Sequence, residues 1–215
     1  VLTVNSGKTL NAGSYTLTLS GTGITPFVHA GGTFSNGTGI VSYTGATANV
    51  ASTTYSNLTL GTGTYTMLAN TTVTGTLTMT ALGTLNAAGT TLTLSGTGTP
   101  FVNSGATFDA QAGTVTYSGA SASIASTTFA NLNLQGDSTL TGAVTVTSTL
   151  ALTAGKTLTA GANSLTFTKD TGTPFTAAGA TFTAGTGTVT YSGTSASIAS
   201  LVYYNLTVNN TGTLS

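Results

Sequence analysis

The amino-acid sequence predicts an all-β chain folded as a three-sided parallel β-solenoid. Three observations favour this fold: a long internal repeat, a shorter rhythm of apolar segments, and a composition almost without charge. Of the 215 residues, 55 are Thr and 29 are Gly, whereas Lys, Arg, Asp and Glu together make up 3%. Ordinary soluble domains are about a quarter charged, and disordered chains usually carry strong net charge. This chain has a formal net charge of zero and fits neither class.

The long repeat is marked by a Thr-Pro-Phe motif. Thr25-Pro26-Phe27 returns at 99–101 and again at 173–175, which defines a strict 74-residue period. Such self-similarity at a fixed period is typical of solenoid architectures. We therefore expect a single β-solenoid over residues 1–215, composed of internal repeats 1–76, 77–149 and 150–215, of which the third is truncated.

Within each repeat, short segments alternate apolar and hydroxyl residues. Thr91-Leu92-Thr93-Leu94 and Thr114-Val115-Thr116-Tyr117 are examples, and Gly, Ser or Asn separates such segments. This alternation is typical of half-buried strands. Nine segments fit one repeat, and grouping them in threes gives coils of about 25 residues, about three per repeat, as in a three-sided solenoid. A β-sandwich also has closely spaced strands, but it gives no reason for a strict 74-residue period.

Aromatic residues recur at fixed places in the repeat, and we expect them to point inward. Like residues of successive coils should then stack in the core. The expected stacked core is Phe27, Phe101, Phe175, Phe34, Phe108, Phe182, Tyr43, Tyr117 and Tyr191.

The composition removes most reagents of catalysis and ligation. There is no Arg, Glu or Cys, a single His, and three scattered Lys, so a basic patch for nucleic acid is not expected. Polar residues interrupt every apolar run well before the roughly 18 residues of a membrane span. The acids Asp109, Asp137 and Asp170 are expected to be solvated surface charges rather than a catalytic pair. The sequence therefore predicts no enzymatic activity, no metal and no cofactor.

Pairs of outward hydroxyls are the main surface pattern. If each pair lay on the third strand of its coil, stacking would give a two-column grid, ~6.7 Å along the strand and ~4.8 Å between coils. The expected array is Thr16 and Thr18, Thr64 and Thr66, Thr91 and Thr93, Thr114 and Thr116, Thr139 and Thr141, and Thr188 and Thr190. It resembles the Thr-x-Thr ranks of β-helical antifreeze proteins, which implies binding of ice or another ordered surface. The alternative is that Thr is frequent because it favours β-strands and keeps the surface soluble without charge.

The two ends of the sequence carry strand-like segments without a recognisable cap. The N-terminal one is Leu2-Thr3-Val4, and the C-terminal ones contain Leu206-Thr207-Val208 and Leu214. Uncapped solenoid ends present open strand edges, and near-zero net charge provides no repulsion between molecules. We therefore expect either end-to-end stacking of subunits or continuation in a longer repetitive protein, and in both cases a fibre.

In its low charge, its Thr, Gly and Ser content and its tandem units, the chain resembles the stalks of bacterial surface adhesins and extracellular filament proteins. The resemblance implies secretion to the cell surface and a non-enzymatic structural or adhesive role. The implied partners are the protein itself and, beyond it, the cell surface, glycans or ice. Alternatives are an ice- or surface-binding protein and, less favoured, a carbohydrate-active β-helix enzyme that uses Asp109 or Asp137.

Overall fold

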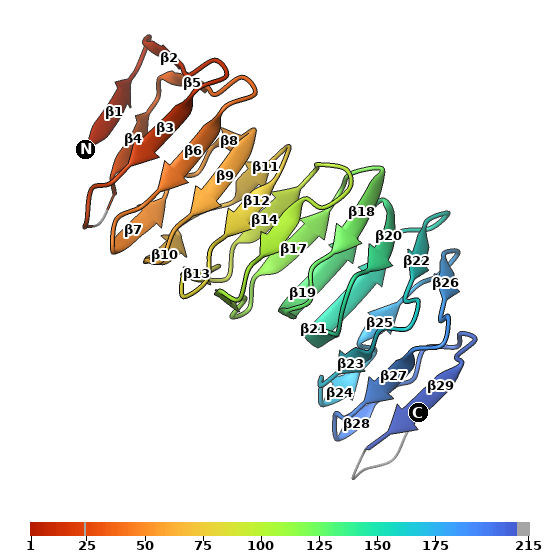
Figure 1. The fold of residues 1–215 in the computed structure, drawn as a ribbon. Coiled ribbons are helices and arrows are strands. Elements are labelled where there is room, and N and C mark those ends of the chain that lie inside the picture. Colours follow the sequence, from red (N-terminus) through yellow and green to blue (C-terminus); the bar gives the residue numbers. More distant parts are fainter. Residues whose placement is uncertain (24, 210–215) are drawn as a thin grey trace. The chain divides into compact units, whose positions relative to one another are not determined.

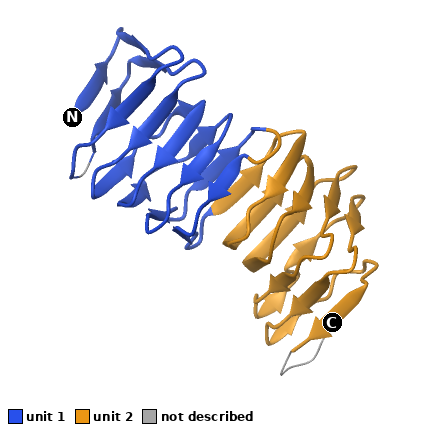
Figure 2. Cartoon of the chain, in the orientation of Figure 1, with its two compact units in different colours: residues 1–96, 100–113 blue, residues 97–99, 114–215 orange. Residues whose placement is uncertain are grey.

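A computed structural model describes residues 1–23 and 25–209, and within them it contains 29 β-strands (Figure 1). The fold is an all-β parallel β-solenoid of about 10 turns, each of about 21 residues, which confirms the predicted fold class. The chain divides into two compact units (Figure 2). Unit 1 comprises Val1–Gly96 and Pro100–Gly113, and unit 2 comprises Thr97–Thr99 and Thr114–Ser215. In the described part of the chain, no helix has the length and apolarity needed to cross a membrane.

Three columns of parallel strands form most of unit 1, and each strand pairs with a strand of the next turn. Its strands are β1 (Leu2–Asn5), β2 (Thr9–Asn11), β3 (Thr16–Leu19), β4 (Phe27–Ala30), β5 (Thr33–Ser35), β6 (Ile40–Tyr43), β7 (Thr47–Val50), β8 (Thr54–Tyr55), β9 (Asn57–Leu60), β10 (Thr64–Met67), β11 (Thr71–Val73), β12 (Leu77–Met79), β13 (Thr84–Asn86), β14 (Thr91–Leu94), β15 (Phe101–Asn103) and β16 (Thr107–Asp109). Face 1A holds β3, β6, β9, β12 and β15; face 1B holds β7, β10, β13 and β16; face 1C holds β8, β11 and β14. β1 pairs with β4, and β2 pairs with β5.

Unit 2 is also three-sided. Its strands are β17 (Thr114–Tyr117), β18 (Ser121–Ile124), β19 (Thr128–Leu134), β20 (Asp137–Leu140), β21 (Val144–Leu152), β22 (Thr157–Thr159), β23 (Leu165–Phe167), β24 (Thr171–Gly172), β25 (Phe175–Thr176), β26 (Thr181–Thr183), β27 (Thr188–Tyr191), β28 (Ser195–Ala196) and β29 (Asn205–Val208). Face 2A holds β17, the second halves of β19 and β21, and β25; face 2B holds β18, β20, β22 and β26; face 2C holds the first halves of β19 and β21, then β23, β27 and β29.

Successive turns differ in length, which corrects the expectation of uniform coils. On face 1A the register passes from Leu17 to Val41 and then to Leu58, Leu77 and Phe101, so the steps along the sequence are unequal, and the step from Val41 to Leu58 is the shortest. With turns of about 21 residues, a 74-residue repeat holds about three and a half turns rather than a whole number. Equivalent residues of successive repeats therefore reach different faces.

Unit 2 shows this change of face directly. Val115 on face 2A pairs with Leu132, whereas Val189, one repeat later, pairs with Leu165 on face 2C. Residues 74 positions apart therefore lie on corresponding strands of the repeat, but these strands can belong to different faces of the solenoid.

The core consists of the inward side chains of these strands. Of the nine aromatic residues expected there, all are buried except Phe34, which is half-buried. They do not stack as like upon like, because Phe27 is in register with Leu2 and Phe101 with Leu77. Instead, neighbouring strands of one turn bring two rings together edge to face, at centroid distances of 4.9 Å for Phe27–Phe34, 5.6 Å for Phe101–Phe108 and 5.4 Å for Phe175–Phe182.

A pair of buried tyrosines joins two strands of one turn in the first repeat. The Tyr43 and Tyr55 hydroxyls lie 3.0 Å apart, Tyr55 donates to the Ala51 carbonyl at 2.8 Å, and the Ala51 N–H donates to Tyr43. The third repeat has the same arrangement in Tyr191, Tyr203 and Ala199. Burial raises the pKa of Tyr55 well above its ordinary value, so the hydroxyl stays protonated and able to donate.

The second repeat has Phe129 in place of the second tyrosine. The Tyr117 hydroxyl consequently has no hydrogen-bond partner among the described residues, although the Ala125 backbone lies near enough to oppose the rise in pKa that burial causes. Its ring lies 6.3 Å from the Phe129 ring, close to the 6.4 Å between Tyr191 and Tyr203. The middle repeat therefore holds a buried hydroxyl whose desolvation the Ala125 backbone offsets only in part.

Phe129→Tyr is expected to stabilise the protein by about 1 kcal/mol, because the new hydroxyl satisfies Tyr117 and donates to the Ala125 carbonyl. The urea midpoint at constant m-value measures this gain. As the matched control, Tyr55→Phe removes the same bond from the first repeat and should lose stability. Destabilisation by Phe129→Tyr would show that the middle repeat cannot accept the pair.

Candidate functional site

The six Thr pairs expected to form one grid lie on six different strands. In unit 1, Thr16 and Thr18 lie on face 1A, Thr64 and Thr66 on face 1B, and Thr91 and Thr93 on face 1C. In unit 2, Thr114 and Thr116 lie on face 2A, Thr139 and Thr141 on and just after β20 of face 2B, and Thr188 and Thr190 on face 2C. Within each unit the three pairs lie on three different faces, and Thr116 is buried, so the expected single grid of outward hydroxyls is wrong. The physical reason is the non-integral number of turns in a repeat.

An in-register grid does exist on face 1B, from residues that sequence reasoning largely missed. Its two outward columns are Thr47–Thr64–Thr84–Thr107 and Asn49–Thr66–Asn86–Asp109. All eight side chains are exposed or half-exposed. The columns lie ~6.7 Å apart along the strand, with ~4.8 Å between turns.

Face 2B repeats this arrangement. One column is Ser123–Thr139–Thr159–Thr183, and the parallel column contains Ser121, Asp137, Thr157 and Thr181. The Asp137 carboxylate accepts a hydrogen bond of 2.8 Å from the Thr157 N–H, which ties the second column across two turns. We call the two outward columns of face 1B and the two outward columns of face 2B the hydroxyl faces. The signal for them in the sequence is the polar pair at i and i+2 of the segments beginning at 47, 84 and 107.

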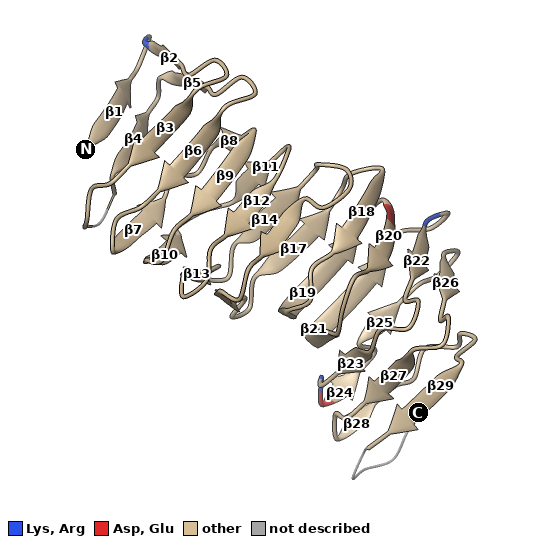
Figure 3. Ribbon diagram, in the orientation of Figure 1, with Lys and Arg blue, Asp and Glu red and all other residues tan. Residues whose placement is uncertain are grey.

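The three carboxylates act locally on backbone groups. Asp109 accepts from the Gln111 N–H at 3.1 Å, and Asp170 accepts from the Thr194 N–H at 3.4 Å and its hydroxyl at 3.1 Å. Figure 3 shows that charged residues are few, with basic and acidic residues side by side at β24. The described residues contain no group of three or more potential metal ligands. Each carboxylate thus accepts a hydrogen bond from a backbone N–H, from two residues further on for Asp109 and from the following turn for Asp137 and Asp170.

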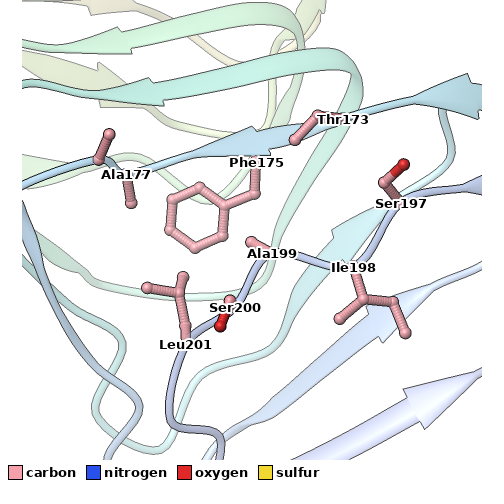
Figure 4. Close-up of a pocket in the computed structure, with 9 residues that line it drawn as sticks. Thr173, Phe175, Ala177, Ser197, Ile198, Ala199, Ser200 and Leu201 are labelled. Atoms are coloured by element: carbon pink, nitrogen blue, oxygen red, sulfur yellow. The ribbon is translucent and has the colours of Figure 1, made fainter. Parts of the chain in front are cut away.

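A cavity of about 330 Å³ lies in unit 2, between β25 and the segment 197–201 (Figure 4). Its apolar wall includes Phe175, Ile198 and Leu201, and Thr173 and Ser200 add hydroxyls. Unit 1 has the equivalent cavity two repeats earlier in the chain, about 200 Å³ in volume, lined by Phe27, His29 and Ser52 among others. Among the residues that line the two cavities, His29 is the one with a side chain that titrates near neutral pH.

The residues expected at an end-to-end interface lie on β1 and β29, the first and last strands of the described residues. β29 pairs with β27, and its Leu206 and Val208 side chains are 43% and 36% exposed. β1 pairs with β4; its Leu2 is half-exposed, Thr3 is exposed and Val4 is buried. Thr207 is half-exposed, and Leu214 lies outside the described residues.

The exposure at β29 is unusual for its position in the repeat. The same position is occupied by Leu58 and Leu60 on β9, which are 2% and 1% exposed because β12 covers them. Comparison of the chain with protein-family models, curated proteins and solved structures found no match. The functional interpretation therefore depends on the geometry of these edges and of the hydroxyl faces.

Proposed function

We propose that the chain is a non-enzymatic extracellular structural protein that forms, or belongs to, a fibre, filament or adhesin stalk through stacking of β-solenoid turns. The supporting observation is the regular parallel pairing of successive turns, in which β6, β9, β12 and β15 add to one another on face 1A. Each such strand is a template for addition of a further strand, so turns of the same kind can stack to any length.

The surface chemistry favours the same role. A formal net charge of zero provides no long-range repulsion between molecules, so exposed edges can approach one another at any ionic strength. The extracellular, cell-surface location is proposed from the likeness in composition and repeat form to adhesin stalks and filament proteins.

Electron microscopy and light scattering of the protein over a range of concentrations test this proposal. We expect particles that grow in length as the concentration rises, with little dependence on salt. Discrete monomers at millimolar concentration would contradict it.

The hydroxyl faces support a second candidate function, binding to an ordered surface such as ice or a crystalline glycan. Four in-register rows on face 1B and four on face 2B present hydroxyl, amide and carboxylate groups at the spacing of the turns. A regular array of largely neutral donors and acceptors suits a partner that is itself periodic and uncharged.

Thr64→Lys is expected to reduce such binding several-fold, because a long cation on face 1B disturbs the in-register array without burying a charge. Thr54→Lys is the matched control: it is equally exposed, but it lies on face 1C. Thermal hysteresis and co-sedimentation with crystalline polysaccharide measure the effect. No hysteresis and no co-sedimentation of the unmodified protein would end this candidate function.

A further inference from the structure

We propose that Asn70 of unit 1 is a site of N-linked glycosylation, at which its side-chain nitrogen Nδ2 receives a saccharide from a lipid-linked diphosphate donor. The inference rests on the extracellular location in the proposed function, because N-linked glycans are carried by secreted chains. It adds a covalent modification that the stacking of turns does not itself require.

The acceptor motif Asn-x-Ser/Thr, in which x is not Pro, begins at five asparagines of the sequence. They are Asn36, Asn57, Asn70, Asn205 and Asn209. In a chain with 55 Thr the motif alone does not single out a site, so the surroundings of each side chain decide. The motif at Asn209 extends to Thr211, outside the described residues, and the other four lie within them.

Asn36 has a structural role in the core of a corner. Its side chain is 6% exposed, and its Nδ2 donates to the Gly39 carbonyl at 3.4 Å. Its Oδ1 accepts from the Ser56 N–H at 2.9 Å, which joins two turns. Because the surroundings of a buried side chain are closely packed, a saccharide on Nδ2 would force this corner open.

Asn57 and Asn205 share a second structural role, since they occupy equivalent positions in the first and third repeats. The Nδ2 of Asn57 donates to the Thr38 carbonyl at 3.2 Å, and the Nδ2 of Asn205 donates to the Thr186 carbonyl at 3.2 Å. Each bond joins the side chain to the preceding turn. Attachment of a saccharide to either nitrogen would therefore compete with a contact between turns.

Asn70 differs from these asparagines in both exposure and bonding. It lies at the corner between β10 and β11, where its side chain and that of Ala69 are exposed and Leu68 is 64% exposed. Its Oδ1 accepts from the Thr91 N–H of the following turn at 2.9 Å, whereas no described residue accepts a hydrogen bond from its Nδ2. The reacting nitrogen is thus the polar atom of this side chain that the fold leaves available.

The chemistry of the linkage preserves the contacts that hold Asn70. In the transfer, Nδ2 attacks C1 of the saccharide, the bond from C1 to the diphosphate oxygen breaks, the diphosphate leaves, and one Nδ2 proton passes to solvent. The product is still an amide, so Oδ1 continues to accept from Thr91. The Ser52 hydroxyl donates to the Asn70 backbone carbonyl at 2.7 Å and is unaffected. A glycan at Asn70 is therefore compatible with the packing of the turns.

Transfer to the purified, folded chain tests this assignment. With an oligosaccharyltransferase and a lipid-linked oligosaccharide, peptide mass spectrometry should find Asn70 modified at least about tenfold faster than Asn57, whose Nδ2 must first leave the Thr38 carbonyl. Both motifs have Thr in third place, so synthetic peptides of residues 55–60 and 68–73 should react at similar rates. Equal rates in the folded chain, or no transfer to Asn70, would overturn the assignment.

Thr72→Val separates recognition of the motif from the fold. It removes the hydroxyl that the motif requires but keeps Asn70 and a β-branched residue on β11, so transfer should be lost at an unchanged urea midpoint. Thr93→Val is the matched control: Thr93 is also half-buried and lies in register with Thr72 on β14, but it belongs to no motif. Transfer to Thr72→Val at the rate of the unmodified chain would also overturn the assignment.

Mass spectrometry of the protein recovered from its source distinguishes this inference from the proposed function. We expect extracellular protein with a glycan on Asn70. Extracellular protein without a glycan on Asn70 would overturn the inference and leave the proposed function intact. Unmodified protein found only inside cells would contradict both.

Discussion

Alanine in place of Gly136 is expected to lower the free energy of unfolding by about 3 kcal/mol or more, although it adds a single methyl group. A Cβ atom on Gly136 would overlap the backbone carbonyl of Gly119, which lies in the preceding turn of unit 2. Backbone atoms cannot move aside as a flexible side chain can, so the two turns must separate and lose hydrogen bonds. Urea denaturation followed by circular dichroism measures the loss.

The matched control for this prediction is Gly21→Ala. Its Cβ would meet the Pro26 Cβ at 3.5 Å, an ordinary van der Waals contact, so stability should change by less than about 1 kcal/mol. Equal effects of the two substitutions would show that close contact between turns does not determine where glycine is needed. In unit 1, a Cβ atom on Gly63 would likewise overlap the Gly45 carbonyl, and a Cβ atom on Gly83 would overlap the Gly61 carbonyl. At these corners glycine therefore allows the backbone of one turn to contact the backbone of the preceding turn directly.

Leu206→Asp is expected to abolish self-association while leaving the fold intact. Leu206 is 43% exposed in the isolated chain, so a carboxylate there remains hydrated until a second strand covers it. Association would then require burial of an unpaired charge, which is strongly unfavourable. Sedimentation velocity should show the variant as a monomer at concentrations where the unmodified protein grows.

The internal counterpart of this position provides the control. Leu132 is 1% exposed, and Leu132→Asp should unfold unit 2, because in that case the charge is buried by the protein's own next turn. Association of Leu206→Asp at unmodified strength would show that self-association does not bury Leu206. Stable folding of Leu132→Asp would contradict the burial on which the comparison depends.

The alternation of apolar and hydroxyl residues predicted the strands, and together with the 74-residue period it predicted the fold class. In strands such as β14 and β17, Leu92 and Val115 are inward, as a period of two requires. The long repeat also located the aromatic core positions. Local pattern determines which side of a strand faces inward, and that information is present in a few consecutive residues.

The face on which each strand lies was not predictable in the same way. It depends on how much chain each corner consumes, and on face 1A the step from Val41 to Leu58 is shorter than the step from Leu77 to Phe101. A small error in each turn accumulates along the chain, which is why Thr64 and Thr91 were expected on one face but lie on different ones.

The tyrosine pair of the middle repeat was also predictable only in part. Tyr43 precedes Tyr55, and Tyr191 precedes Tyr203, at the same spacing, so the replacement of the second tyrosine by Phe129 was visible in the sequence. Its consequence for the Tyr117 hydroxyl required the structure, because the partner of a buried group depends on how two strands of one turn pack.

The most direct test of stacking as the role of this chain is hydrogen exchange at the Leu206 amide over a range of protein concentrations. In the isolated chain this N–H points away from β27, the one described strand that pairs with β29, and should exchange rapidly. Strand addition predicts that it becomes protected as concentration rises, while the Asn209 amide, already bonded to Tyr191, changes little. Exchange at Leu206 that stays rapid at every concentration would contradict end-to-end stacking through this edge.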